Sequence, residues 1–274
     1  MQNFNHRISR DVGDILTDTF QYVRIHYKTL GKGLVFFVFP LYLIQAFLMQ
    51  GYSDQIFSTL FEPDAIFDFF GWRYFTSIAI SLLAYGVLSV VALKHLDLTD
   101  QGIDPQPNDL ISDSVPLIFR FIGLYILLFL ILIASAFFFF FPAVFFGIRL
   151  SLAPAALIFE NRGVGDAISR SWELTQGYWW ATFVLFFIMY IIVIFTTYVF
   201  ILPATILSIF LMDSGAASEA NNYSTLFTVF TSFSAAFGSL FTAILHISFA
   251  LQFYNLVERK EGGSLRSRIE SLVD

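Results

Sequence analysis

Long apolar runs, separated by short polar segments, dominate the pattern of this chain. Each of six runs approaches or exceeds the roughly 20 residues that cross the hydrocarbon core of a bilayer. We predict six transmembrane helices from them, at residues 34–49, 74–93, 117–141, 143–159, 178–202 and 226–257. Pro40 should bend the first of these helices, and Pro203 should end the fifth. The predicted fold class is all-α, a polytopic six-transmembrane-helix bundle.

Two amphipathic segments precede the first and the fifth of these helices. At residues 11–28, apolar side chains recur at three- and four-residue steps, and charged side chains occupy the opposite face. Residues 164–177 show the same alternation, with Trp172 on the apolar face and Arg170 on the polar face. A helix of this kind beside a membrane-spanning segment lies in the plane of the interface. We therefore expect two interfacial amphipathic helices.

The two amphipathic segments are related in sequence. Both begin with Val-Gly-Asp, at residues 12–14 and 164–166, and the same offset aligns Gly86 with Gly238. This offset predicts an internal parallel repeat within a single membrane domain that covers residues 1–274. We assign the parts as a first repeat at about 11–95, an intervening hairpin at 117–160, a second repeat at about 163–257 and a charged tail at 258–274.

The lysine and arginine residues indicate the orientation of the chain. With six membrane-spanning helices, all of these residues except Arg73 and Arg149 fall on one side of the membrane. Basic residues are enriched in cytoplasmic segments. We therefore predict that both termini, the two amphipathic helices and the tail are cytoplasmic.

The overall composition agrees with a membrane protein and excludes several other classes. Hydrophobic residues make up 57% of the chain, charged residues make up 13%, and the mean hydropathy is +0.72, whereas soluble domains have about 25% charged residues. The chain has no cysteine, which excludes disulfides and thiol catalysis. The net charge is −6, and because the chain has no basic patch of the kind that nucleic acid requires, we expect no nucleic-acid partner. The first apolar run begins at Leu34, so we expect no cleaved signal peptide.

One short motif resembles a known family. The run from Ser171 to Trp179, Ser-Trp-Glu-Leu-Thr-Gln-Gly-Tyr-Trp, follows Ala167 and Ile168, and a Val-Gly-Asp-Ile opening lies near the N-terminus. Together with six predicted helices, these features resemble a bacterial membrane-domain family named after the glycerophosphoryl diester phosphodiesterases. The resemblance implies an α-helical inner-membrane module. It does not imply phosphodiesterase activity, because the catalytic barrel and its signature motifs have no counterpart in this chain.

Four residues are candidates for ligand binding. Arg149 lies well inside a predicted helix, where its side chain could reach the outer headgroups, bond backbone carbonyls freed near a proline, or bind an anion such as a lipid phosphate. Trp172 and Trp179 could hold a lipid headgroup or belong to an interfacial aromatic belt. His246 follows Ser234, Gly238 and Thr242 at four-residue steps on one predicted helix. Such spacing is typical of close helix packing, with Gly86 as a further packing residue, and the alternative is a permeation stripe.

The sequence contains no recognisable catalytic or metal-binding motif. The four histidines are isolated, no G-x-S-x-G is present, and no carboxylate lies deep inside a predicted helix, which disfavours ion-coupled transport. We expect neither a cofactor nor a metal. The favoured function is a non-enzymatic membrane module that organises lipid or partner proteins, with membrane lipids and a protein at the cytoplasmic face as its partners. The alternatives are a lipid or small-solute transporter without ion coupling and, third, a membrane-embedded enzyme.

Overall fold

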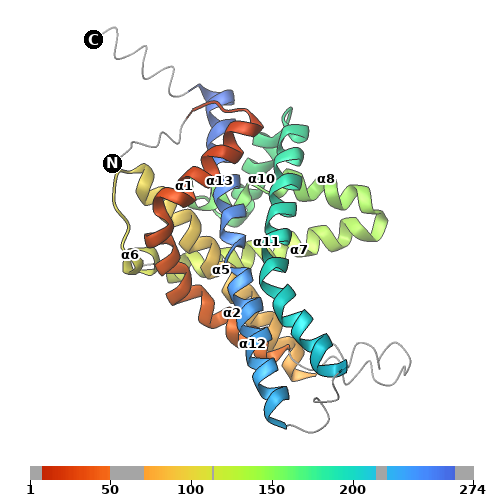
Figure 1. Ribbon diagram of the computed structural model, residues 1–274. Coiled ribbons are helices and arrows are strands. Elements are labelled where there is room, and N and C mark those ends of the chain that lie inside the picture. The colour runs from red at the N-terminus through yellow and green to blue at the C-terminus, as the bar shows by residue number, and fades with distance from the viewer. Residues whose placement is uncertain (1–7, 50–70, 113, 214–220, 263–274) are drawn as a thin grey trace. The chain divides into compact units, whose positions relative to one another are not determined.

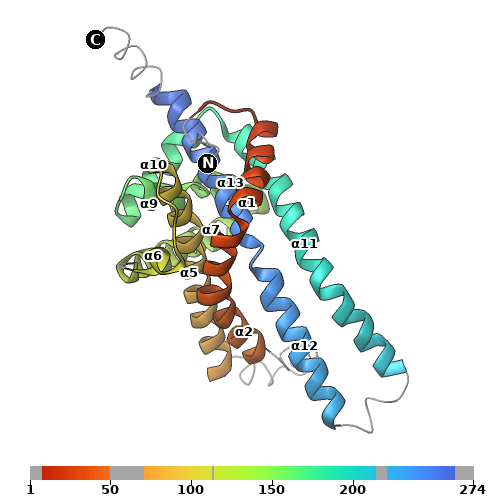
Figure 2. The same cartoon turned by 60° about the vertical axis from the view of Figure 1, so that its left-hand side comes forward.

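The computed structural model describes residues 8–49, 71–112, 114–213 and 221–262, and these residues form helices without strands (Figures 1 and 2). Six helical stretches are long and apolar enough to cross a membrane. They cover Val12–Leu48, Trp72–Asp100, Val115–Phe138, Phe140–Phe159, Trp179–Pro203 and Val229–Glu261. The prediction of an all-α fold with six membrane-spanning helices is confirmed. Residues 50–70, 113, 214–220 and 263–274, which include most of the predicted tail at 258–274, lie outside the described residues.

The first membrane-spanning stretch consists of three consecutive helical parts. Helix α1 (Val12–Gly33) leads through the π-helical turn η1 (Leu34–Val38) directly into α2 (Phe39–Leu48). Pro40 is the second residue after the π-helical turn. Because proline has no amide hydrogen, the regular α-helical hydrogen-bond pattern is interrupted there. The first amphipathic segment is therefore the beginning of a longer helix.

The second stretch is longer than the sequence predicted. Helix α5 (Trp72–Asp100) continues past the predicted end at Leu93, and the short helix α6 (Pro107–Ile111) follows it. The additional turns carry His95 and Leu96, both fully buried. Burial of these two side chains stabilises a helical continuation that the polar composition of residues 97–113 does not indicate.

The predicted third and fourth helices meet one turn earlier than expected. Helix α7 (Val115–Phe138) ends at the extended residue Phe139, and α8 (Phe140–Leu150) begins directly after it. The turn was expected at Pro142, but Pro142 lies in the first turn of α8, where a missing amide hydrogen removes no helical bond. A second break separates α8 from α9 (Ala153–Phe159), so the predicted fourth helix is two helices.

Two further predictions of helix ends were wrong. Helix α10 (Val164–Thr175) is followed by α11 (Trp179–Asp213), which continues through Pro203 instead of ending there. A proline removes one hydrogen bond, whereas ending a helix in an apolar surrounding would leave several backbone groups unpaired. The predicted sixth helix consists of α12 (Asn221–Ser239) and α13 (Thr242–Glu261), separated by a turn at Leu240 and Phe241.

The chain forms two compact units. The first unit contains Met1–Gly33, Ser89–Ile192 and Thr242–Asp274, and the second contains Leu34–Leu88 and Val193–Phe241. In the first unit α13 is the central helix, because it contacts α1, α9 and α10 and buries most of its side chains between Ala243 and Leu256. Helices α1 and α13 lie side by side in both views (Figures 1 and 2). In the second unit α2 packs against α12.

Candidate functional site

Helix α10 is the element around which the candidate site is built. It begins after Gly163, has Asp166 in its first turn, where a negative charge stabilises the helix dipole, and ends before Gln176. Gly177 follows with a φ of +85°, a left-handed conformation that glycine adopts without strain. The buried face of α10 consists of Ala167, Ser171, Leu174 and Thr175. Ala167 and Leu174 follow the apolar spacing of the sequence, whereas Ser171 and Thr175 are small polar residues that an apolar pattern does not indicate.

Ser171 holds α10 against the break between α8 and α9. Its hydroxyl donates to the backbone carbonyl of Arg149 at 2.7 Å, and its Oγ accepts from the backbone N–H of Leu152 at 3.1 Å. The break removes both backbone groups from the regular helical ladder, and Ser171 is fully buried. One hydroxyl therefore bonds a donor and an acceptor that the helix break leaves without helical partners, and the Thr175 hydroxyl adds a longer bond of 3.4 Å to the same carbonyl.

Arg149, the first candidate residue, extends from the last turn of α8 to the C-terminal end of α10. Its Nη1 donates to the carbonyl oxygen of Trp172 at 3.2 Å. Trp172 lies in the last turn of α10, where carbonyl oxygens lack a backbone N–H partner within the helix and a cation is stabilising by about 0.3–1 kcal/mol. The hydroxyl of Thr175 also donates to the Trp172 carbonyl, at 3.2 Å. The guanidinium thus bonds a backbone carbonyl, although one at a helix end and not one freed by a proline.

Aromatic rings enclose the same guanidinium. Its Cζ lies 4.9 Å from the ring centroid of Trp172 and 5.3 Å from that of Phe145. Trp179, the third candidate, stacks on Phe145 with ring centroids 5.9 Å apart and donates from its indole nitrogen to the Phe145 carbonyl at 3.3 Å. The neighbouring Trp180 is 72% exposed. Arg149, Trp172 and Trp179 therefore form one cluster with Phe145, which we call the Arg149 site.

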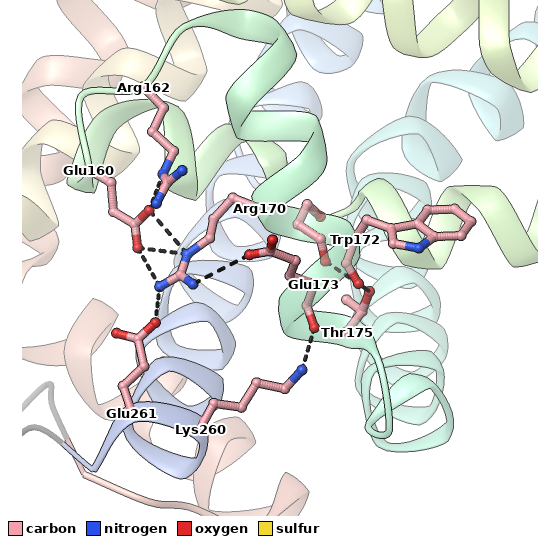
Figure 3. Close-up of polar contacts among 9 residues, drawn as sticks. Glu160, Arg162, Arg170, Trp172, Glu173, Thr175, Lys260 and Glu261 are labelled. Carbon is pink, nitrogen blue, oxygen red and sulfur yellow. Dashed lines mark hydrogen bonds and ion pairs between the residues drawn. The ribbon is translucent and has the colours of Figure 1, made fainter.

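The opposite face of α10 carries an ion-pair cluster with the C-terminal turn of α13 (Figure 3). Arg170 contacts Glu160 at 2.8 Å and Glu261 at 2.5 Å, and Glu173 lies farther away at 3.8 Å. Arg162 also pairs with Glu160, and Lys260 donates to the carbonyl oxygen of Glu173. Burial lowers the pKa of the Arg170 guanidinium, but hydrogen bonds and charge from Glu160 and Glu261 outweigh it and raise the pKa overall. Arg170 is consequently a permanent cation that joins α10 to α13.

His246, the fourth candidate, belongs to a separate buried network. Its Nδ1 donates to the carbonyl oxygen of Thr242 at 3.1 Å, so its Nε2 is the acceptor in neutral imidazole. Ser89 Oγ lies 2.9 Å from this Nε2 and 2.6 Å from the hydroxyl of Tyr125. Sequence reasoning missed Ser89 and Tyr125, because neither residue belongs to a motif and each comes from a different helix.

A second histidine network lies between α1 and α5. The hydroxyl of Tyr22 lies 2.6 Å from His95 Nδ1, the hydroxyl of Thr29 lies 2.9 Å from His95 Nε2, and the rings of His26 and His95 are 5.4 Å apart. The sequence prediction treated these histidines as isolated. A usable signal existed, since Tyr22, His26 and Thr29 recur at helical spacing on one face. Within the described parts of the chain, no group of three or more potential metal-binding side chains occurs.

Three of the predicted packing residues lie on the two sides of the turn between α12 and α13, and the fourth, Gly86, lies in α5. A methyl group added at Gly238 would lie 3.2 Å from the Thr197 side chain, so α12 approaches α11 closely there. Gly86 and Ser234 are buried. Thr242 follows the turn at the start of α13, so the four-residue stripe that ends in His246 is not one continuous helix face.

Comparison with known proteins gives no relative for this chain. No protein family, no curated protein and no solved structure matches it. The resemblance carried by Ser171 to Trp179 therefore stays a prediction from those residues.

Proposed function

We propose that this protein is a non-enzymatic integral membrane module that organises lipid at one membrane interface, with α10 and the start of α11 as its lipid-contacting element. The observation that carries the proposal is the Arg149 site, in which a cation lies between aromatic rings at the junction of an amphipathic helix with a membrane-spanning helix. Tryptophan side chains prefer the headgroup region, where the ring is in an apolar surrounding and the indole nitrogen finds a polar partner.

The polar side chains of α13 support a packed module over a solute pathway. Gln252 donates from its amide nitrogen to the hydroxyl of Thr182 at 3.0 Å, and Asn255 donates to the Gln252 amide oxygen at 3.0 Å. The amide oxygen of Asn255 accepts from the backbone N–H of Arg10 at 2.8 Å. Side chains that satisfy one another in this way fix a helix among its neighbours, whereas a permeating solute needs polar groups that it can bond itself.

Ion pairs at one end of the first unit support an orientation of the chain in the membrane. Arg259 contacts Asp11 at 3.1 Å and Arg170 contacts Glu261 at 2.5 Å, so the start of α1, helix α10 and the end of α13 meet at one end of the first unit. Basic residues gather at this end. We propose that it faces the cytoplasm of a bacterium and that the chain lies in the inner membrane.

Fluorescence quenching by brominated lipids tests the lipid contact. Trp72→Phe removes the remaining tryptophan and leaves Trp172, Trp179 and Trp180 as the emitters. We expect vesicles with bromine near the headgroup end of the lipid chain to quench this variant more strongly than vesicles with bromine near the chain terminus. The additional change Trp180→Phe should reduce the quenching, because Trp180 is the most exposed of the three. Equal emission in brominated and ordinary vesicles would refute the proposal.

A further inference from the structure

We infer that Arg149 binds a phosphate oxyanion through the side of its guanidinium that carries Nε and Nη2. This inference rests on the proposed function, because it names the ligand that the lipid-contacting element recognises. It depends on which nitrogen atoms of Arg149 have acceptors and which do not.

The hydrogen bonds of Arg149 leave one edge of the guanidinium unused. Nη1 donates to the carbonyl oxygen of Trp172, whereas the buried Nε has no hydrogen-bond partner among the described residues. In the same part of the chain, no carboxylate forms an ion pair with Arg149. Nε and Nη2 lie side by side, and their two N–H groups form a fork that matches two oxygen atoms of a phosphate or a carboxylate.

The unused edge is unfavourable without a ligand. A buried donor on a charged group loses its hydration, and without a partner it gains no hydrogen bond in return. An anion that accepts from this donor recovers the free energy lost on desolvation, and this recovered free energy favours binding. The rings of Trp172 and Phe145 hold the plane of the guanidinium by cation–π contacts, and the bond to Trp172 fixes its rotation. The fork is thus oriented before the ligand arrives, which lowers the entropic penalty of binding.

None of the carboxylates in the described part of the chain pairs with this fork. Glu173 directly follows Trp172 in the sequence, but its carboxylate lies beside Arg170. Glu160 and Glu261 are also paired with Arg170. In a membrane, the oxyanions concentrated at the depth of interfacial tryptophans are lipid phosphates. Free inorganic phosphate has the same chemistry, and the experiment separates the two sources.

Native mass spectrometry of the purified protein tests the inference. The protein is released from nanodiscs that contain equal parts of phosphatidylglycerol and phosphatidylcholine, and the retained lipids are counted for wild type, Arg149→Lys, Arg149→Leu and Arg120→Leu. Arg120 is the matched control, because its loss changes the net charge equally and its Nη1 bonds Asn161 at 3.1 Å, away from the Arg149 site. A second arm measures thermal stabilisation by inorganic phosphate in lipid-free detergent micelles.

We expect wild type and Arg120→Leu to retain a lipid that both Arg149 variants lose, with affinity reduced about tenfold to a hundredfold by Arg149→Leu. Arg149→Lys should also lose affinity, because lysine keeps the charge but has no fork. Stabilisation of wild type but not of Arg149→Leu by inorganic phosphate, with equal lipid counts, supports the fork and assigns free phosphate to it.

Two results would overturn the inference. Equal lipid retention by wild type and folded Arg149→Leu, with no specific phosphate effect, would show that the fork is empty or hydrated. Wild-type retention by Arg149→Lys would show that charge alone acts and that the fork recognises nothing. Because the quenching experiment reports on tryptophan depth and not on Arg149, either result leaves the proposed lipid contact to be judged separately.

Discussion

Helices α1 and α10 begin with the same three residues, Val-Gly-Asp, but they differ in length and in how they connect to the next helix. Helix α1 is 22 residues long and leads without a loop into a membrane-spanning helix, whereas α10 is 12 residues long and is separated from α11. The repeat offset aligns Gly177, in its left-handed conformation, with Ile25, which lies inside α1. A β-branched residue is strained at positive φ. The shared motif therefore determines where each helix begins, and later residues determine where it ends.

A second difference concerns a buried hydroxyl. Thr19 and Ser171 occupy equivalent positions and both are fully buried. The Thr19 hydroxyl donates to the carbonyl oxygen of Ile15 in its own helix, whereas the Ser171 hydroxyl bonds the break between α8 and α9. The same chemical group supports local structure in one helix and tertiary structure in the other.

Both helices have an ion pair at an equivalent position, but the signs of the two charges are exchanged between them. Asp18 and Arg170 are equivalent positions, and each pairs with an opposite charge that precedes its helix, Arg10 at 2.5 Å and Glu160 at 2.8 Å. Both pairs also lie near α13, through contacts of Arg259 with Asp11 and of Glu261 with Arg170. This correspondence supports the internal repeat, which stays a prediction until the two halves are superposed.

The largest expected effect comes from the hydroxyl comparison. Ser171→Ala should lower the free energy of unfolding by about 2–4 kcal/mol, because it leaves the Leu152 N–H buried without a partner and the Arg149 carbonyl with only the 3.4 Å bond from the Thr175 hydroxyl. Thr19→Ala should cost less than about 1 kcal/mol, because the Ile15 carbonyl keeps its helical hydrogen bond. Denaturant titration in detergent micelles, followed by circular dichroism, measures both values. Equal destabilisation by the two changes would mean that the contact between Ser171 and the break contributes nothing specific.

The exchanged ion pairs should give the next largest effect. Arg170→Gln should destabilise the protein by about 1–3 kcal/mol, because it leaves Glu160 and Glu261 close together without their shared cation. Asp18→Asn should destabilise it by about 1 kcal/mol, since it removes one partner of one arginine. The same titration at low and high salt separates the contributions, because salt screens exposed pairs most strongly. A larger effect of Asp18→Asn than of Arg170→Gln would show that α1, and not α10, depends more on its ion pair.

The outcome of the sequence predictions follows from the kind of signal that each used. Apolar runs identified all six membrane-spanning stretches, because length and composition decide whether a helix can cross a bilayer. Helix ends were less predictable. The continuation of α5 past Leu93 depends on the burial of its side chains. The continuation of α11 through Pro203 depends on an apolar surrounding, in which no water is present to hydrogen-bond the backbone groups of a helix end. Arg149 was singled out by its depth in an apolar run. Its contact with Trp172, in contrast, depends on the break between α8 and α9, which no local pattern indicates.

The smallest expected effect concerns the residue that ends α10. Gly177→Ala should lower the free energy of unfolding by about 1–2 kcal/mol, because a side chain at a φ of +85° is strained although nothing lies within 4 Å of the added methyl group. Gly165→Ala is the matched control, since Gly165 lies inside α10, also has open space around it and has no positive φ. This change should stabilise the protein by up to about 1 kcal/mol, because alanine favours helix. The difference in sign between the two alanines isolates backbone conformation from side-chain contacts. If Gly177→Ala instead stabilised the protein, the left-handed turn would not be what separates α10 from α11, and the contrast with α1 would need another cause.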